Sequence, residues 1–184
     1  MYKPFLPISL ICILLFPAWL DAQTLYGTDK GFISFHSDAP LELISAKCDE
    51  MRGRLDIEKK IFAFSVKINA FKGFNNPLQR EHFNENYLES NQYPNASFSG
   101  KIIEDIDFSV DGTYTVRAKG NLSVHGVVQE RIIKGELLVK KGVLSITANF
   151  MVFLADHNIA IPKVVHEKLA SEIKVEVKAD LTPQ

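Results

Sequence analysis

Apolar and polar residues alternate along much of the chain after residue 23. The clearest run places Leu144, Ile146, Ala148, Phe150, Val152 and Leu154 on one face, against Ser145, Thr147 and Asn149 on the other. A period of two is typical of a β-strand with one buried face and one solvated face. The same alternation predicts strands over residues 62–68, 114–124 and 173–179.

Shorter apolar runs predict further strands, over residues 32–37, 41–48, 51–57, 96–103 and 131–140. Turn signals separate several of them: Asp111–Gly112, Lys119–Gly120–Asn121 and Lys140–Lys141–Gly142–Val143. Short links of this kind favour antiparallel hairpins. The pair His125–Gly126 predicts a bulge or a tight approach, because glycine within a strand pattern usually marks one.

Many short strands with few helices between them predict an all-β fold, either a closed barrel or a sandwich. Closure into a barrel removes the exposed edges that would otherwise promote aggregation. An antiparallel barrel of about eight strands is large enough to hold one small apolar ligand.

One segment departs from the strand pattern. Asn75–Asn76–Pro77 predicts a helix start, with an asparagine cap and proline in the first turn. The helix is expected to continue to residue 88 and to turn Phe83 and Tyr87 inward, since residues four apart share one face. A second, shorter turn is expected near residues 161–164.

The first 22 residues have the pattern of a cleaved secretory signal peptide. Lys3 precedes the uncharged, strongly apolar run Phe5–Leu20, and Ala22 supplies a small residue for cleavage. The alternative is an uncleaved membrane anchor, but this run is shorter than a span of about 20 residues and prolines interrupt it. We therefore expect an exported chain that starts near Gln23, forms a single domain over residues 23–184 and has no integral membrane span.

Composition narrows the classes of function. The 21 Lys and Arg nearly cancel the 22 Asp and Glu, so no basic face is expected for nucleic acid. Two cysteines are too few for a disulfide scaffold or a four-cysteine zinc site. Cys48 would be the one cysteine of the cleaved chain, and we expect it to be buried.

The polar candidates for chemistry are few. Four residues on or just after the predicted helix could share a face and ligate a metal, namely Glu81, His82, Glu85 and Glu89. A solvated helix face is the commoner arrangement, so no metal is expected. His36 and His125 lie beside apolar strand residues and would be the active residues if the chain were an enzyme. Hydrogen-bonded structural histidines are the favoured interpretation, and we expect no catalytic residue.

Three stretches are similar to one protein family. Residues 80–88 followed by Tyr93–Phe98 resemble its helix, proline and aromatic-led strand, residues 120–127 resemble its glycine and His–Gly–Val string, and Phe35–His36–Ser37 resembles its opening strand. On these residues the chain resembles the YceI-like family, exported lipid-binding proteins of bacteria.

The resemblance implies a lipocalin-like, closed antiparallel barrel of about eight strands, with one helix capping an opening. It also implies a periplasmic location and an interior that binds a polyisoprenoid or a similar long apolar amphiphile, with no other cofactor. Whether two barrels pair as a homodimer stays open.

The candidate ligand-binding residues lie on the apolar faces of the predicted strands and helix: Phe64, Val66, Phe83, Tyr87, Phe98, Leu122, Phe150 and Val175. Each methylene of a lipid tail gains about 0.8 kcal/mol on leaving water, so an apolar lining needs no specific polar contact. The alternative is a structural or stress-related exported barrel with a filled core that acts through its surface.

Overall fold

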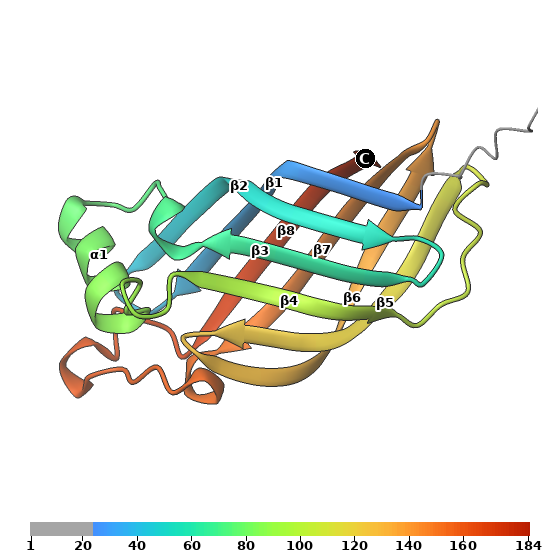
Figure 1. Ribbon diagram of the computed structural model, residues 1–184. Helices are drawn as coiled ribbons and strands as arrows, with labels where there is room; N and C mark the ends of the chain where they lie inside the picture. Colours follow the sequence, from blue (N-terminus) through green and yellow to red (C-terminus); the bar gives the residue numbers. More distant parts are fainter. Residues whose placement is uncertain (1–23) are drawn as a thin grey trace, which may run out of the picture.

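A computed structural model describes residues 24–184, which form a closed barrel of eight antiparallel strands (Figure 1). The strands are β1 (Leu25–Asp38), β2 (Leu43–Asp56), β3 (Ile61–Lys67), β4 (Asn95–Ile102), β5 (Gly112–Val124), β6 (Val127–Lys140), β7 (Val143–Phe153) and β8 (Glu172–Pro183). Each strand pairs with the next, and β8 pairs with β1 to close the barrel. The predicted all-β barrel is confirmed, and the sandwich is excluded.

The predicted helix is also present. Helix α1 (Pro77–His82) is capped by the Asn76 side chain, which accepts a hydrogen bond from the backbone N–H of Gln79 at 2.9 Å. A π-helical turn, η2 (Phe83–Tyr87), continues it. Three short 3₁₀ turns complete the helical structure: η1 (Ile68–Ala70), η3 (Leu154–His157) and η4 (Lys163–Val165).

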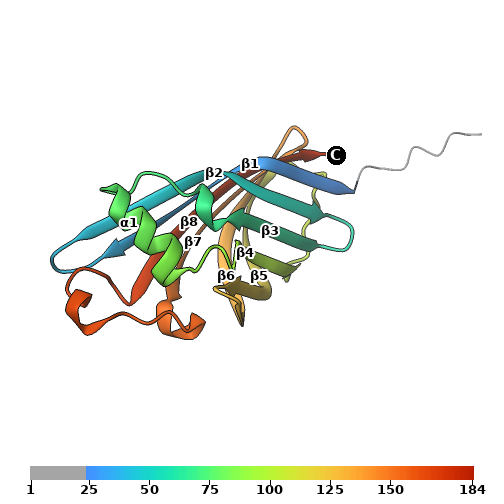
Figure 2. The same ribbon diagram turned by 60° about the vertical axis from the view of Figure 1, so that its left-hand side comes forward.

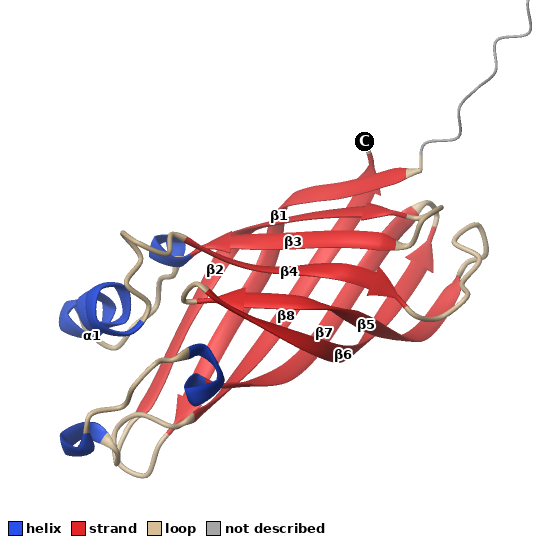
Figure 3. Cartoon of the chain, turned by 60° about the horizontal axis from the view of Figure 1, so that its bottom comes forward, coloured by secondary structure: helices blue, strands red, loops and turns tan. Residues whose placement is uncertain are grey.

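All of the helical segments gather at one end of the barrel, as Figure 3 shows. In Figure 2, α1 faces the orange segment that carries η3 and η4 across this end. The opposite half of the barrel is filled by side chains that are almost completely buried, namely Leu55, Leu137, Leu144 and Leu181. Burying a leucine stabilises a fold by roughly 1.5–3 kcal/mol. The barrel therefore has one plugged end and one end that the helical segments cover.

Two sequence-based expectations about strand boundaries were wrong. Residues 41–48 and 51–57 are not separate strands, because β2 runs unbroken through Asp49 and Glu50. Lys119–Gly120–Asn121 is not a turn but lies in the middle of β5. Gly120 is there because it lies directly opposite Gly100 of β4, where the two backbones approach too closely for a side chain.

His125–Gly126 proves to be the hairpin turn between β5 and β6, not a bulge within one strand. Both residues have positive φ, 50° and 71°, as a two-residue hairpin turn requires. The expected tight approach is real, since a Cβ on Gly126 would lie 2.4 Å from the ring of Tyr93.

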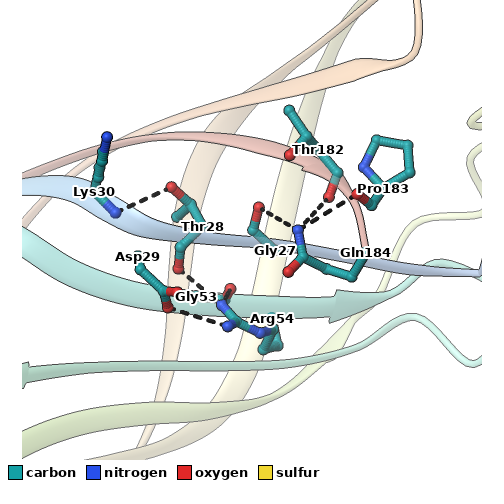
Figure 4. A network of polar contacts seen from close by, with 9 residues as sticks. All are labelled: Gly27, Thr28, Asp29, Lys30, Gly53, Arg54, Thr182, Pro183 and Gln184. Carbon is teal, nitrogen blue, oxygen red and sulfur yellow. Dashed lines mark hydrogen bonds and ion pairs between the residues drawn. The ribbon is translucent and has the colours of Figure 1, made fainter.

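The pairing of β1 shifts register near its start, and an arginine from β2 bridges the irregularity (Figure 4). The Arg54 guanidinium donates to the carbonyl oxygens of Thr28 and Gly53 at 2.9 and 2.8 Å, and to the Asp29 carboxylate at 3.1 Å. Arg54 thus supplies hydrogen bonds where the regular ladder is interrupted.

The predicted signal peptide, residues 1–22, lies outside the described residues. Within residues 24–184, no helix has the length and apolar character to cross a membrane.

Candidate binding cavity

The covered end of the barrel contains an apolar cavity of about 460 Å³, the outer chamber. Its walls come from strands on both sides of the barrel, from α1 and η2, and from the segment between β7 and β8. A volume of this size is typical of small-molecule sites.

A smaller chamber of about 130 Å³ lies deeper in the barrel. The two chambers adjoin, since five wall residues belong to both: Ile33, Val66, Ala96, Leu122 and Phe150. Leu55 and Leu137, which are almost completely buried, form part of the inner wall. The inner chamber therefore borders the plugged half of the barrel, and the outer chamber lies under the helical segments.

An aromatic cluster holds the cap on the barrel. The Phe83 ring of η2 stacks on Phe35 of β1, with centroids 5.2 Å apart and planes 12° apart. It also contacts Phe71 and Phe74, at 5.8 and 5.1 Å, from the loop before α1. Such pairs contribute about 0.5–1.5 kcal/mol each beyond their buried area.

The charged and amide side chains of the cavity wall belong to the outer chamber alone. The Gln79 side-chain amide of α1 donates to the Glu42 carboxylate at 2.5 Å, and Lys168 contributes to the same rim. Tyr87 also lines this chamber, and burial raises the pKa of its phenol. A molecule with one polar end and one long apolar end would therefore lie with its polar end at the mouth.

The structure places all eight predicted lining residues on the cavity. Phe83, Tyr87 and Val175 line the outer chamber, Phe64 and Phe98 line the inner one, and Val66, Leu122 and Phe150 line both. The prediction missed several wall residues, among them Phe71, Phe74 and Ala96. Phe71 and Phe74 lie in an irregular loop, where no periodicity indicates which side chains face the interior. Ala96 has a small side chain, which gives only a weak hydrophobic signal.

One stretch of the wall is closed by side chains rather than by a backbone ladder. β6 pairs with β7 only from Gly135 to Lys140, although both strands extend further. Beyond this point the Arg131 guanidinium donates to the Met151 carbonyl at 2.9 Å and to the Asp156 carboxylate at 3.2 Å. Gln129 donates to the Asp156 carbonyl at 2.7 Å, so these two side chains join β6 to η3.

His36 and His125 do not meet inside the barrel. His36 is exposed, whereas His125 joins three segments at the covered end. Its Nδ1 lies 3.1 Å from the His157 carbonyl oxygen, its Nε2 lies 2.6 Å from a Glu89 carboxylate oxygen, and its ring contacts Tyr93 edge-on. These contacts give His125 a structural role beside the cavity.

Two further sequence-based expectations concern cysteine and metal. Cys48 is buried, as expected, and burial raises the pKa of its thiol. Among residues 24–184, no group of three or more His, Cys, Asp or Glu side chains is arranged to hold a metal ion.

Stability should fall as the pH drops below about 6.5, the ordinary pKa of histidine. His157 is buried, with Nδ1 3.2 Å from the Val127 carbonyl, and burial lowers its pKa in the folded protein. As the pH falls, the unfolded chain therefore binds a proton at this histidine before the folded protein does. The stabilisation that neutral His157 gives the folded protein is present above about pH 6.5 and is lost as the pH falls toward the folded pKa.

The measurement is urea unfolding between pH 8 and 5, for the wild type and His157→Asn. The wild type should keep its stability from pH 8 to about 6.5 and lose it below that pH, whereas the variant should be less stable at pH 8 but show a flatter dependence. The paired carboxylates Glu104 and Asp105 have lowered pKa values and titrate in a more acidic range, because Arg117 and Lys60 stabilise their charged forms. Equal slopes for both proteins would contradict this prediction.

Comparisons with known proteins agree with this architecture. A family model described as the YceI-like domain matches residues 28–181. A polyisoprenoid binding domain from Saccharophagus degradans, implicated in plant cell wall breakdown, aligns with a TM-score of 0.74 at 12% identity, covering 89% of this chain and 100% of that one.

Two further solved structures share the fold. BcnA from Burkholderia cenocepacia aligns with a TM-score of 0.68 at 11% identity, covering 83% of this chain and 96% of its own. The YCEI protein of Campylobacter jejuni aligns with a TM-score of 0.53 at 16% identity, covering 98% of this chain and 89% of that one. No curated protein sequence matches the chain.

Proposed function

The chain belongs to the YceI-like domain family, and on this premise we propose that it is an exported protein that holds a polyisoprenoid or a similar long apolar amphiphile inside its barrel. The observation that carries the proposal is the apolar cavity of two adjoining chambers inside the barrel. A similar structure, from Saccharophagus degradans, is described as a polyisoprenoid binding domain, which supports the same ligand class here.

The shape of the cavity suggests how the ligand lies. The inner chamber offers almost no polar surface, so it suits the end of an apolar tail. The rim of the outer chamber carries Glu42, Gln79 and Lys168, which suit a polar head group. Transfer of the tail from water, at about 0.8 kcal/mol per methylene, supplies the driving force.

Export completes the proposal. Residues 1–22 would act as a cleaved signal peptide and deliver residues 23–184 to the periplasm as one domain. We propose a binding role without catalysis, because the cavity wall is dominated by apolar side chains and His125 is engaged in structural contacts.

The alternative role, a barrel with a filled core that acts through its surface, makes a different prediction. Such a protein would take up no amphiphile. Purified protein should be stripped with organic solvent, refolded and exposed to a mixture of polyisoprenoids of different lengths. The proposal predicts stoichiometric uptake of one amphiphile per barrel, and no uptake would favour the alternative.

Replacing Tyr87 by alanine is expected to weaken ligand retention without unfolding the protein. Tyr87 is half-buried and lies on the wall of the outer chamber, beside the mouth rather than in the plugged end. Losing one ring contact should speed ligand release by roughly ten-fold, which corresponds to about 1.4 kcal/mol. Lipid load and melting temperature are measured together, with Tyr87→Phe as the control that keeps the ring. A full lipid load in Tyr87→Ala would show that η2 does not retain the ligand.

A further inference from the structure

Large aliphatic side chains are exposed around the mouth of the outer chamber. The exposed fractions are 66% for Leu41, 67% for Leu43, 56% for Leu78 and 89% for Val164. Leu41 precedes β2, Leu43 begins it, Leu78 lies in α1 and Val164 lies in η4. We call these four residues the collar.

Hydrogen bonds hold the three collar segments next to one another. The backbone N–H of Leu41 donates to the Glu167 carbonyl at 2.8 Å, which joins the β1–β2 turn to the segment after η4. The Asn75 side-chain amide donates to the Leu43 carbonyl at 2.9 Å, which joins the same turn to the start of α1. Leu78 itself lines the chamber, and Glu42, Ile44 and Val165, the chain neighbours of the other three, line it too, so the collar lies at the edge of the chamber.

A single exposed aliphatic residue needs no explanation, but a group of them on one rim marks an interaction site. Folding does not require these side chains to be apolar, because most of each one faces solvent. Their one shared feature is their position at the entrance of a cavity suited to a lipid tail.

Resting on the proposed function, we infer that the collar docks on the surface of a lipid bilayer, with the mouth of the outer chamber facing the membrane. In this position an amphiphile passes between the bilayer and the cavity without its tail crossing water. Each exposed methylene of the collar also gains from burial among the acyl chains.

Charge and size favour a bilayer over a protein partner. The charged groups on and beside the collar are nearly balanced, with Arg80, Lys163 and Lys168 against Asp38, Glu42, Glu81 and Glu167. Docking is therefore driven by apolar insertion and should not require anionic lipids. Four side chains are also far fewer than the 20–30 residues per partner of a typical stable protein interface.

The first experiment needs no bound ligand. Val164→Trp places a fluorophore on the collar, and Ile61→Trp places one at the start of β3, at the plugged end, where Ile61 is 50% exposed. The only natural tryptophan, Trp19, contributes the same background to both proteins if it is retained. Each protein is mixed with vesicles of brominated phosphatidylcholine, which quench tryptophan at membrane depth.

We expect quenching and a blue shift for Val164→Trp, and neither for Ile61→Trp. Adding phosphatidylglycerol to 30% should change the binding less than two-fold. No quenching of residue 164, or equal quenching of both residues, would overturn the inference. Concentration-dependent self-association that is lost on changing Leu43 and Val164, without quenching, would assign the collar to a second copy and overturn it too.

The second experiment measures transfer of a fluorescent polyisoprenoid from loaded protein to phosphatidylcholine vesicles. The collar variant is Leu43→Ser with Val164→Ser, and the control is Ile61→Ser with Ile132→Ser, two exposed residues away from the mouth. None of the four lines either chamber. The collar variant should transfer at least ten-fold more slowly than the wild type, and the control should match the wild type.

The outcomes separate this inference from the proposed function. A wild type that loads the polyisoprenoid, with equal transfer from both variants, would overturn the collar inference and leave the proposed function standing. A wild type that takes up no polyisoprenoid would overturn the proposed function. In that case, tryptophan quenching would still show whether the collar binds a bilayer.

Discussion

Replacing Ala96 by phenylalanine is expected to exclude the ligand tail from the inner chamber while the barrel stays folded. Ala96 lies on β4 and belongs to the wall of both chambers. A phenylalanine ring there would enter existing space, so it should block the passage between the chambers without the strain of an overpacked core.

The expected loss of affinity is large. If the blocked chamber holds about four methylenes, their exclusion costs roughly 3 kcal/mol, which is about a hundred-fold in Kd. The measurement is the Kd for a fluorescent polyisoprenoid, taken together with the melting temperature. Ala63→Phe is a matched control, since Ala63 is exposed on the outside of the neighbouring strand β3. Unchanged affinity in Ala96→Phe would show that the tail does not reach the inner chamber.

Replacing Gly100 by alanine is expected to destabilise the barrel severely. A Cβ at this position would lie 2.1 Å from the carbonyl oxygen of Lys119 and 2.5 Å from the Cα of Gly120. Both are backbone atoms of β5, so relief requires the two strands to separate. Overpacking of this kind costs about 3 kcal/mol, near the upper end of its usual range.

Urea unfolding gives the measurement, and Gly112→Ala is the matched control. The nearest contact of a Cβ on Gly112 is the Tyr114 side chain at 3.3 Å, which can move, so its effect should stay below 1 kcal/mol. Similar midpoints for the two variants would contradict the close approach of β4 and β5.

The strands of the barrel were predictable where one face is buried and the other is wet. On β7, Leu144 and Val152 are buried while Asn149 is exposed, as the alternation requires. The helix start was predictable because Asn76 and Pro77 act locally. Both signals depend only on residues that are close together in the sequence, so they can be recognised without knowledge of the fold.

Features that depend on distant contacts were not predictable. The sequence around Gly120 indicates a turn, and only the pairing of Gly120 with Gly100 explains why this glycine lies within a strand. Arg131 has the polarity of a surface residue, yet it closes the wall where β6 and β7 are not paired. Six of the eight candidate lining residues followed from strand alternation, and Phe83 and Tyr87 followed from helical spacing. The division of the cavity into two chambers depends on packing across the barrel.

The central claim is that the cavity holds a long apolar amphiphile, and native mass spectrometry of the protein purified from its own host tests it most directly. We predict a folded species that carries one additional mass of several hundred daltons, which is released on unfolding and extracts into organic solvent. A protein that is free of any such mass, and that also takes up none from a polyisoprenoid mixture, would contradict the claim.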